Sequence, residues 1–267
     1  VLYGEFIFKF YDSEMIPIQC CNNLLDDTYD SVVFVADSYK NQSAELQSLS
    51  KAIASYHEIN EDLTGVHVVP FPEHSKHRLV FSNTGVLNRD FDDSRNIYEA
   101  AGAGIKKALK AGSKKPLLVL GNLSTAPSEE HWSRDHNPLI TALLGAHYAL
   151  YTPIEIREDC PDRACKAQVL GVYKCSQEVE KFVHAVEMGR SVARDIGGSD
   201  PERMAAPKIA EYIQSTFAKD SCIKITVEKV DENKYPLMAA VNRCASVVER
   251  HDGRVVHFTY DGGNADT

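Results

Sequence analysis

Short apolar runs alternate along the chain with longer stretches in which apolar residues recur at helical spacing. The runs are four to eight residues long and rich in Val, Leu, Phe and Tyr, so they predict buried strands. The predicted strands cover residues 31–36, 66–70, 78–82, 116–120 and 168–173. The helical spacing predicts helices over residues 44–57, 93–111 and 138–151, and Gly112 stands where a helix C-cap is expected. This alternation predicts an α/β layer fold with a mostly parallel or mixed sheet.

The pattern changes after the last of these strands. Residues 157–163 are polar and predict an exposed loop. A long amphipathic helix is expected over residues 177–196, ended by Gly197 and Gly198. Its apolar stripe comprises Val179, Phe182, Val183, Val186 and Ala193, a pattern typical of interdomain packing.

The last part of the chain begins with Ser199 and Glu202 at capping-box spacing. A helix after Pro207, a short helix over residues 235–243 and strands over residues 223–227 and 254–260 are predicted. Two helices and two strands are few for a self-sufficient domain, so we expect this second unit to continue beyond Thr267. Residues 1–10 predict a strand instead of a signal peptide.

The composition of the chain excludes several classes of function. Of the 267 residues, 43% are hydrophobic and 25% are charged, which is typical of a globular protein. The net charge of −9 argues against nucleic acid and against an anionic membrane surface as partners. No run of 18 apolar residues occurs. The seven cysteines form no framework of paired spacings, which favours free thiols in a reducing compartment and hence a cytoplasmic protein.

Several segments carry a family resemblance. Residues 190–196, Arg-Ser-Val-Ala-Arg-Asp-Ile, are followed by Asp200-Pro201 and by Pro207-Lys208-Ile209-Ala210-Glu211. Two segments lie further along the chain, Tyr-Pro-Leu-Met-Ala-Ala-Val at residues 235–241 and the strand pattern of residues 254–260. A third segment, the helix pattern of residues 98–106, lies upstream. Residues 190–211 resemble the leucyl aminopeptidase (cytosol aminopeptidase) family at the junction of its two domains. Residues 235–241 and 254–260 resemble the helix and the first strand of its catalytic domain, and residues 98–106 a helix of its N-terminal domain. The resemblance covers about the last quarter of the chain and residues 90–112.

The resemblance implies an organisation and an activity. Residues 1–175 would form an N-terminal α/β/α layer domain similar in fold to macro domains, residues 176–198 the interdomain helix, and residues 199–267 the opening of an α/β metallopeptidase domain. The resemblance also implies that the intact protein removes N-terminal residues from peptides with the help of two divalent ions, zinc or manganese. It further implies that the protein forms hexamers. Glu202, Arg203 and the segment 242–246 depart from the family pattern, which implies a divergent member and weakens the expectation of the ordinary leucine preference.

The family's metal ligands have no counterpart in these 267 residues. The two-metal site uses a Gly-Lys-Gly…Asp-x-Gly-Gly segment and an Asn-Thr-Asp-Ala-Glu-Gly-Arg segment, and neither occurs here. We expect both beyond Thr267. No catalytic, metal-binding or cofactor-binding residue is therefore assigned, and this chain by itself is expected to bind no metal and to be inactive.

Several local groupings could suggest other chemistry. Glu73, His74 and His77 are spaced like metal ligands, but the prolines around them favour a solvated loop. His131, Asp135 and His136 flank Trp132, where a helix-entry segment is favoured over a zinc site. Cys160 and Cys165 lack Cys-x-x-Cys spacing, so free loop thiols are favoured.

Two further groupings concern phosphate binding and nucleophilic catalysis. Residues 82–85 and 121–125 follow predicted strands, where loops can cradle phosphates, but no Gly-x-Gly-x-x-Gly or Walker motif occurs and ordinary turns are favoured. Asp195 and Ser199 flank two glycines without a nucleophile elbow, so Ser199 is interpreted as a cap.

Two functional hypotheses follow. In the first, the chain is part of a metal-dependent aminopeptidase that acts on peptide substrates, as a homo-oligomer or with a companion catalytic chain. In the second, it is a degenerate or processed homologue that serves as a non-catalytic structural or binding subunit.

Overall fold

A computed structural model describes residues 15–124, 137–217 and 222–260. Their contacts divide the chain into two compact units. We call residues 15–152 and 160–191 the sheet unit. We call residues 153–159 and 192–267, together with residues 1–14, the ribbon unit. The predicted strand at residues 1–10 lies outside the described residues.

The sheet unit is built on one six-stranded sheet of order β1-β6-β5-β2-β4-β3. Its strands are β1 (Ile18–Cys21), β2 (Ser31–Ala36), β3 (Val66–Pro70), β4 (Arg78–Asn83), β5 (Pro116–Leu120) and β6 (Leu170–Tyr173). All neighbours pair in parallel except β3, which runs antiparallel to β4. The α/β layer fold with a parallel-rich sheet is confirmed, while β1 had not been predicted.

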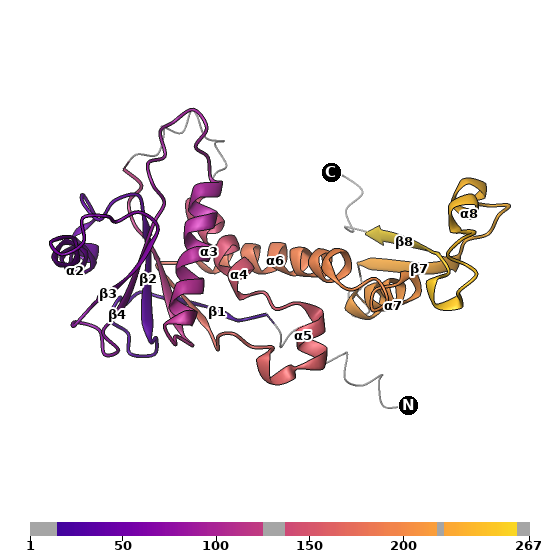
Figure 1. Ribbon diagram of the computed structural model, residues 1–267, viewed down its shortest axis with the longest axis horizontal. Helices are drawn as coiled ribbons and strands as arrows, with labels where there is room; N and C mark the ends of the chain where they lie inside the picture. The colour runs from indigo at the N-terminus through magenta and orange to yellow at the C-terminus, as the bar shows by residue number, and fades with distance from the viewer. Residues whose placement is uncertain (1–14, 125–136, 218–221, 261–267) are drawn as a thin grey trace. The chain divides into compact units, whose positions relative to one another are not determined.

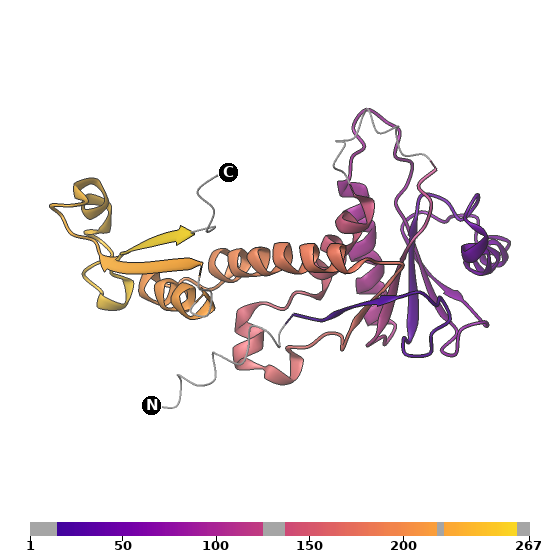
Figure 2. The ribbon, with the colours of Figure 1, turned by 180° about the vertical axis from the view of Figure 1, so that it is seen from behind.

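Helices cover both faces of this sheet (Figure 1). A 3-10 turn (Ala44–Leu46) and α2 (Gln47–His57) cover one face, while α3 (Arg95–Lys110) and α4 (Pro138–Leu150) cover the other, as the reverse view also shows (Figure 2). The α3 helix ends as its sequence predicts, because Gly112 adopts a positive φ of 90° and donates to the Leu109 carbonyl.

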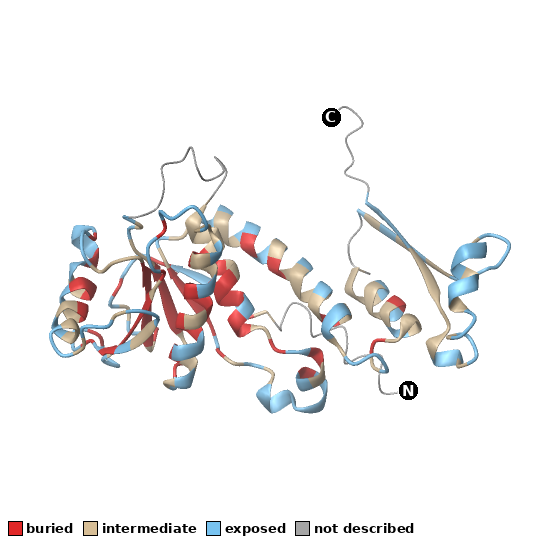
Figure 3. Ribbon diagram, turned by 45° about the horizontal axis from the view of Figure 1, so that its top comes forward, coloured by how far each residue is buried: buried red, intermediate tan, exposed pale blue. Residues whose placement is uncertain are grey.

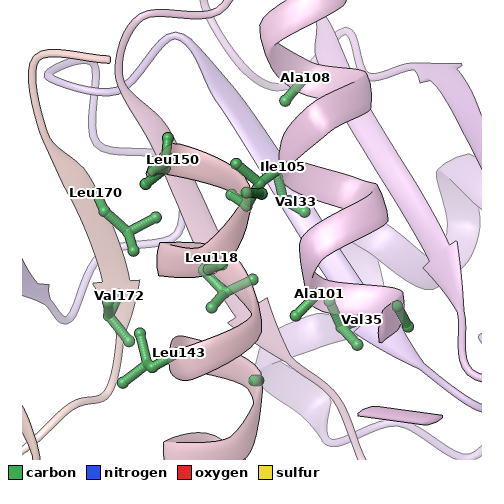
Figure 4. Close-up of a cluster of buried hydrophobic side chains, with 14 of the residues drawn as sticks. Val33, Val35, Ala101, Ile105, Ala108, Leu118, Leu143, Leu150, Leu170 and Val172 are labelled. Carbon is green, nitrogen blue, oxygen red and sulfur yellow. The ribbon is translucent and has the colours of Figure 1, made fainter. Parts of the chain in front are cut away.

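The core of the sheet unit lies in two layers. On the α3 and α4 face, Val33 of β2, Ile105 of α3 and Leu143 of α4 meet without solvent exposure (Figure 4). On the α2 face, Phe34 and Phe81 pack with their ring centroids 6.0 Å apart. Central strands are buried on both faces, which is why they are continuous apolar runs in the sequence.

The boundary between the two units falls inside helix α6 (Gln177–Gly198), between Ser191 and Val192. The predicted stripe of this helix is only partly buried. Val183 is fully buried and Val179 packs against the core of the sheet unit, but Phe182 is 53% exposed. The helix ends at the two glycines, as predicted, with Gly197 and Gly198 as its last two residues.

The ribbon unit contains α5 (Ile154–Asp159), α7 (Ala206–Phe217), α8 (Pro236–Asn242) and an antiparallel pair of strands, β7 (Ile223–Lys229) and β8 (Arg254–Tyr260). Its exposed and half-exposed residues contrast with the buried centre of the sheet unit (Figure 3). Phe258 meets Phe217 of α7 edge-on at 5.0 Å, and Val241 is 82% exposed.

No helix among the described residues is long and apolar enough to cross a membrane.

Candidate functional site

The carboxyl ends of β2, β4 and β5 form one edge of the parallel sheet, where α/β proteins commonly bind ligands. The turns suggested for phosphate binding lie here. Gly121 follows β5 and is held close to its neighbours, because a Cβ at this position would stand 2.6 Å from the Phe34 ring. The glycine is thus required by close packing inside the fold.

Polar groups at this edge bond to one another. The backbone N–H of Asn122 donates to Gln42 Oε1 at 2.7 Å, and Gln42 Nε2 donates to the carbonyls of Ser38 at 2.8 Å and Asn122 at 3.2 Å. This exchange joins the turn after β2 to the turn after β5. The Asn122 amide, which could have faced a phosphate, is therefore occupied.

The neighbouring turn and a carboxylate at this edge also argue against phosphate binding. Asn83 Oδ1 accepts the Gly85 N–H at 2.8 Å, and Ser124 Oγ donates to the Asp37 carboxylate at 3.3 Å. A carboxylate opposes the approach of an anion. The described part of this edge has the hydrogen bonds of ordinary turns.

The loop between β3 and β4 differs from its prediction as a solvated segment. His74 is 1% exposed and stacks on Phe71 with ring centroids 6.3 Å apart, and its Nδ1 accepts the Lys76 N–H at 3.3 Å. Burial lowers the pKa of His74. Glu73 and His77 remain exposed, so His74 packs as an aromatic residue without them.

Within the described ranges, no group of three His, Cys, Asp or Glu side chains could hold a metal ion. Cys160 and Cys165 are exposed free thiols, and Cys165 donates to the Ala167 carbonyl at 2.7 Å. The grouping of His131, Asp135 and His136 lies outside the described residues.

A buried charged cluster occupies the ribbon unit. Arg157 of α5 forms an ion pair with Asp195 of α6, and both side chains are almost completely buried. Tyr212 of α7 donates its hydroxyl to the second oxygen of the same carboxylate at 2.6 Å. Burial raises the pKa of Tyr212, so its phenol stays protonated and acts as a donor.

The cluster corrects one prediction and adds one residue that sequence reasoning missed. Residues 157–163 had been predicted as an exposed loop, but Arg157 lies on a helix and faces inward. Pro153 followed by Ile154 and Ile156 was the available signal for a short helix. Sequence reasoning also missed Tyr212, whose partners in other helices no local pattern reveals.

The capping-box prediction for Ser199 and Glu202 is wrong as well. Ser199 Oγ donates to Glu155 Oε1 at 2.7 Å, and Asp200 Oδ1 accepts the backbone N–H of Glu202 at 2.9 Å. The carboxylate of Glu202 instead receives hydrogen bonds from Arg250 and His251, at 2.8 and 2.7 Å.

A surface hollow of about 500 Å³ adjoins these residues, lined by Pro207, Val248, Glu249, Arg250 and Arg254. Its two guanidinium groups are engaged, that of Arg250 by Glu202 and that of Arg254 by Asp252, both at 2.8–2.9 Å. The hollow therefore presents no unpaired cation to an anionic ligand.

Known proteins resemble this chain in sequence and in fold. No family model matches the chain. A Caenorhabditis elegans protein named "Putative aminopeptidase W07G4.4" is 42% identical over 193 residues, which cover 69% of this chain and 35% of that protein. The chain thus spans about a third of its curated relative.

Solved structures share the fold at low sequence identity. A tomato leucine aminopeptidase variant matches with a TM-score of 0.67 at 12% identity, over 95% of this chain and 52% of its own. The leucyl aminopeptidase of Trypanosoma cruzi matches with a TM-score of 0.64 at 11% identity, over 97% and 52%. The bottromycin maturation enzyme BotP in complex with Mn matches with a TM-score of 0.60 at 15% identity, over 88% and 46%.

The curated relative and the solved structures point to the same family as the sequence resemblance. The parallel-rich sheet and its covering helices match the N-terminal domain of the leucine aminopeptidases. The predicted resemblance to a divergent leucyl aminopeptidase-like member is confirmed by this relative and by the shared fold.

Proposed function

We propose that the complete protein is a metal-dependent aminopeptidase that releases N-terminal residues from peptides. The observation that carries this proposal is the 42% identity to the nematode aminopeptidase-like relative over 193 residues. Residues 1–175 would form its N-terminal domain, residues 176–198 the interdomain helix, and residues 199–267 the opening of its catalytic domain.

Two divalent ions, zinc or manganese, would belong to the complete enzyme. The manganese in the BotP complex supports this choice. The residues described here do not fit such a site, because Asp195, the buried carboxylate of the ribbon unit, is already engaged by Arg157 and Tyr212. The proposal therefore assigns the metal ligands to residues other than those described, and no catalytic step to this chain.

The β7–β8 ribbon is suited to continuation by further strands. Its apolar residues pair across one face, as Ile223 with Tyr260, Ile225 with Phe258 and Val227 with Val256. Phe258 is nevertheless 47% exposed, and within the described residues β8 pairs with β7 alone. A half-exposed apolar strand that is paired on one side favours the addition of a further strand. The rest of a catalytic domain would supply that strand.

The proposal extends to assembly and location. A hexamer, or a complex with a companion catalytic chain, and a cytoplasmic location follow from the family resemblance. The seven cysteines without paired spacing support the reducing compartment.

Peptidase assays and native mass measurement test this function. The purified 267-residue chain, supplied with zinc or manganese, is expected to release no amino acid from an N-terminal leucyl or alanyl peptide. Protein isolated from its source with an antibody to this chain is expected to be active. Its mass should exceed that of the 29.7 kDa chain, as a longer polypeptide or with a bound companion.

Two outcomes would contradict the proposal. Metal-dependent turnover by the isolated chain would mean that the catalytic groups lie within these residues. An inactive native species of 29.7 kDa without a companion would favour the non-catalytic subunit instead.

A further inference from the structure

Two cysteines from distant parts of the chain meet at the edge of the sheet unit. Cys20 lies on the edge strand β1, paired in register with Val172 of β6, and Cys175 follows the end of β6 by two residues. The Lys174 N–H donates to the Cys21 carbonyl at 2.8 Å and so extends this ladder. Lys174 then adopts a left-handed conformation with φ of 53°, which turns the chain into α6 and brings Cys175 back beside Cys20.

Cys20 and Cys175 lie close enough for each thiol to affect the pKa of the other, and both lie beside Glu180. Cys20 Sγ also donates to Glu180 Oε2 at 3.5 Å from the first turns of α6. Cys175 is half-buried against the core of the sheet unit, whereas Cys20 is exposed.

The adjacent Cys21 does not compete for this position, because successive side chains of a strand point to opposite faces. Cys21 belongs to the core layer on the α2 face, where its Sγ donates to the Asn23 carbonyl at 3.1 Å. Cys175 packs against the opposite layer. Cys20 and Cys175 are therefore the pair that the sheet places on one side.

We propose that Cys20 and Cys175 form a modification site at which a small-molecule disulfide such as glutathione disulfide converts the two thiols into an intramolecular disulfide. The exposed Cys20 thiolate attacks one sulfur of glutathione disulfide, forming a mixed disulfide and releasing one glutathione thiolate. The Cys175 thiolate then attacks the Cys20 sulfur, which breaks the mixed disulfide and releases the second glutathione. Both protein thiol protons pass to the two departing glutathiones, so the protein loses two electrons and the glutathione disulfide gains them.

The surroundings determine the resting state of this pair. Partial burial raises the pKa of Cys20 to about 12, with the neighbouring Cys175 and Glu180 adding to the effect, and burial also raises the pKa of Cys175. Both sulfurs are accordingly thiols at neutral pH, and the pair exchanges slowly unless a disulfide partner is abundant. Once formed, the cross-link would tie the edge strand β1 to the start of α6.

Thiol mapping on the full 267-residue chain tests the proposal. The reduced protein is incubated with glutathione disulfide, its remaining thiols are alkylated, and the tryptic peptides are sequenced by mass spectrometry. We expect residues 175–181 to be linked to the peptide that contains Cys20, with fragment ions assigning the bond to Cys20 and not Cys21. Cys21→Ser and Cys160→Ser, as matched controls, should keep the cross-link.

The single variants separate the two steps. Cys175→Ser should accumulate a stable glutathione adduct at Cys20, and Cys20→Ser should lose the cross-link. Wild-type protein that keeps glutathione on Cys20 while Cys175 remains alkylatable would overturn the proposal. A cross-link to residues 175–181 that persists in Cys20→Ser would overturn it as well.

Discussion

Gly145 of α4 lies directly against the backbone of Tyr98 in α3, and a Cβ at Gly145 would stand 2.8 Å from the Tyr98 carbonyl carbon. Gly102 of α3 faces Gly145 in return, because a Cβ there would be 3.0 Å from the Gly145 carbonyl oxygen. The two helices therefore approach through glycine, and this close crossing holds the α3 and α4 layer on the sheet. A side chain at either position must push backbone against backbone.

Gly145→Ala should destabilise the sheet unit by about 1–3 kcal/mol, the usual cost of overpacking, despite the better helix propensity of alanine. Chemical denaturation followed by circular dichroism measures the change. Gly189→Ala is the matched control, since nothing lies within 4 Å of its added Cβ. An equal loss in both variants would refute the close helix contact.

Removing Asp195 should unfold the ribbon unit more readily, because Arg157 would keep a buried charge without its carboxylate. Asp195→Ala should cost about 3–5 kcal/mol, as for other broken buried pairs. Tyr212→Phe should cost about 1.5–3 kcal/mol, the loss of one hydrogen bond to a charged group. Hydrogen exchange of α7 amides reports both changes.

Glu211→Gln provides the comparison for that cluster, because its partner Lys208 and the glutamate are both 64% exposed. An exposed pair contributes little. If the α7 amides exchanged equally fast in Asp195→Ala and Glu211→Gln, the buried ion pair would not contribute to stability.

Glu228 should make the ribbon sensitive to acid. Hydrogen bonds from Lys234, Tyr235 and His257 lower the pKa of Glu228 from 4.5 to about 2. A depressed folded-state pKa means that this contribution is fully present above pH 4.5 and is lost as the pH falls through about 2. Carboxyl NMR titration should therefore give Glu228 a midpoint near 2, and Lys234→Met should raise it. A midpoint unchanged by that substitution would rule out Lys234 as the leading partner.

Two phenylalanines should differ sharply in their cost of truncation within this chain. Phe34→Ala should cost about 3–5 kcal/mol, because the ring is fully buried in the sheet unit. Phe258→Ala should cost no more than about 1–2 kcal/mol, since half of its surface is already exposed. Hydrogen exchange of β2 and β7 amides measures each unit separately. A Phe258→Ala effect as large as that of Phe34→Ala would mean that β8 is already part of a complete core.

Local pattern was sufficient for the central elements of the fold. The apolar runs of β2 and β5 and the stripe of α3 were predicted almost to the residue, because burial on both faces of a strand or one face of a helix leaves a periodic record. The family resemblance came mainly from the last quarter of the chain and was confirmed by comparison. Composition and spacing were thus sufficient for the α/β layer fold.

Contacts between distant residues were decided only by the tertiary structure. Arg157 looked like part of a solvated loop because its partner Asp195 is far along the chain, and His74 looked exposed because its neighbours are polar. The proximity of Cys20 and Cys175 likewise depends on β1 lying beside β6. The four residues of β1 have too weak a strand pattern to predict this pairing. A sequence pattern records whether a side chain is buried, whereas the identity of its partner is set by which elements the fold brings together, and that choice is made by packing across the whole sheet.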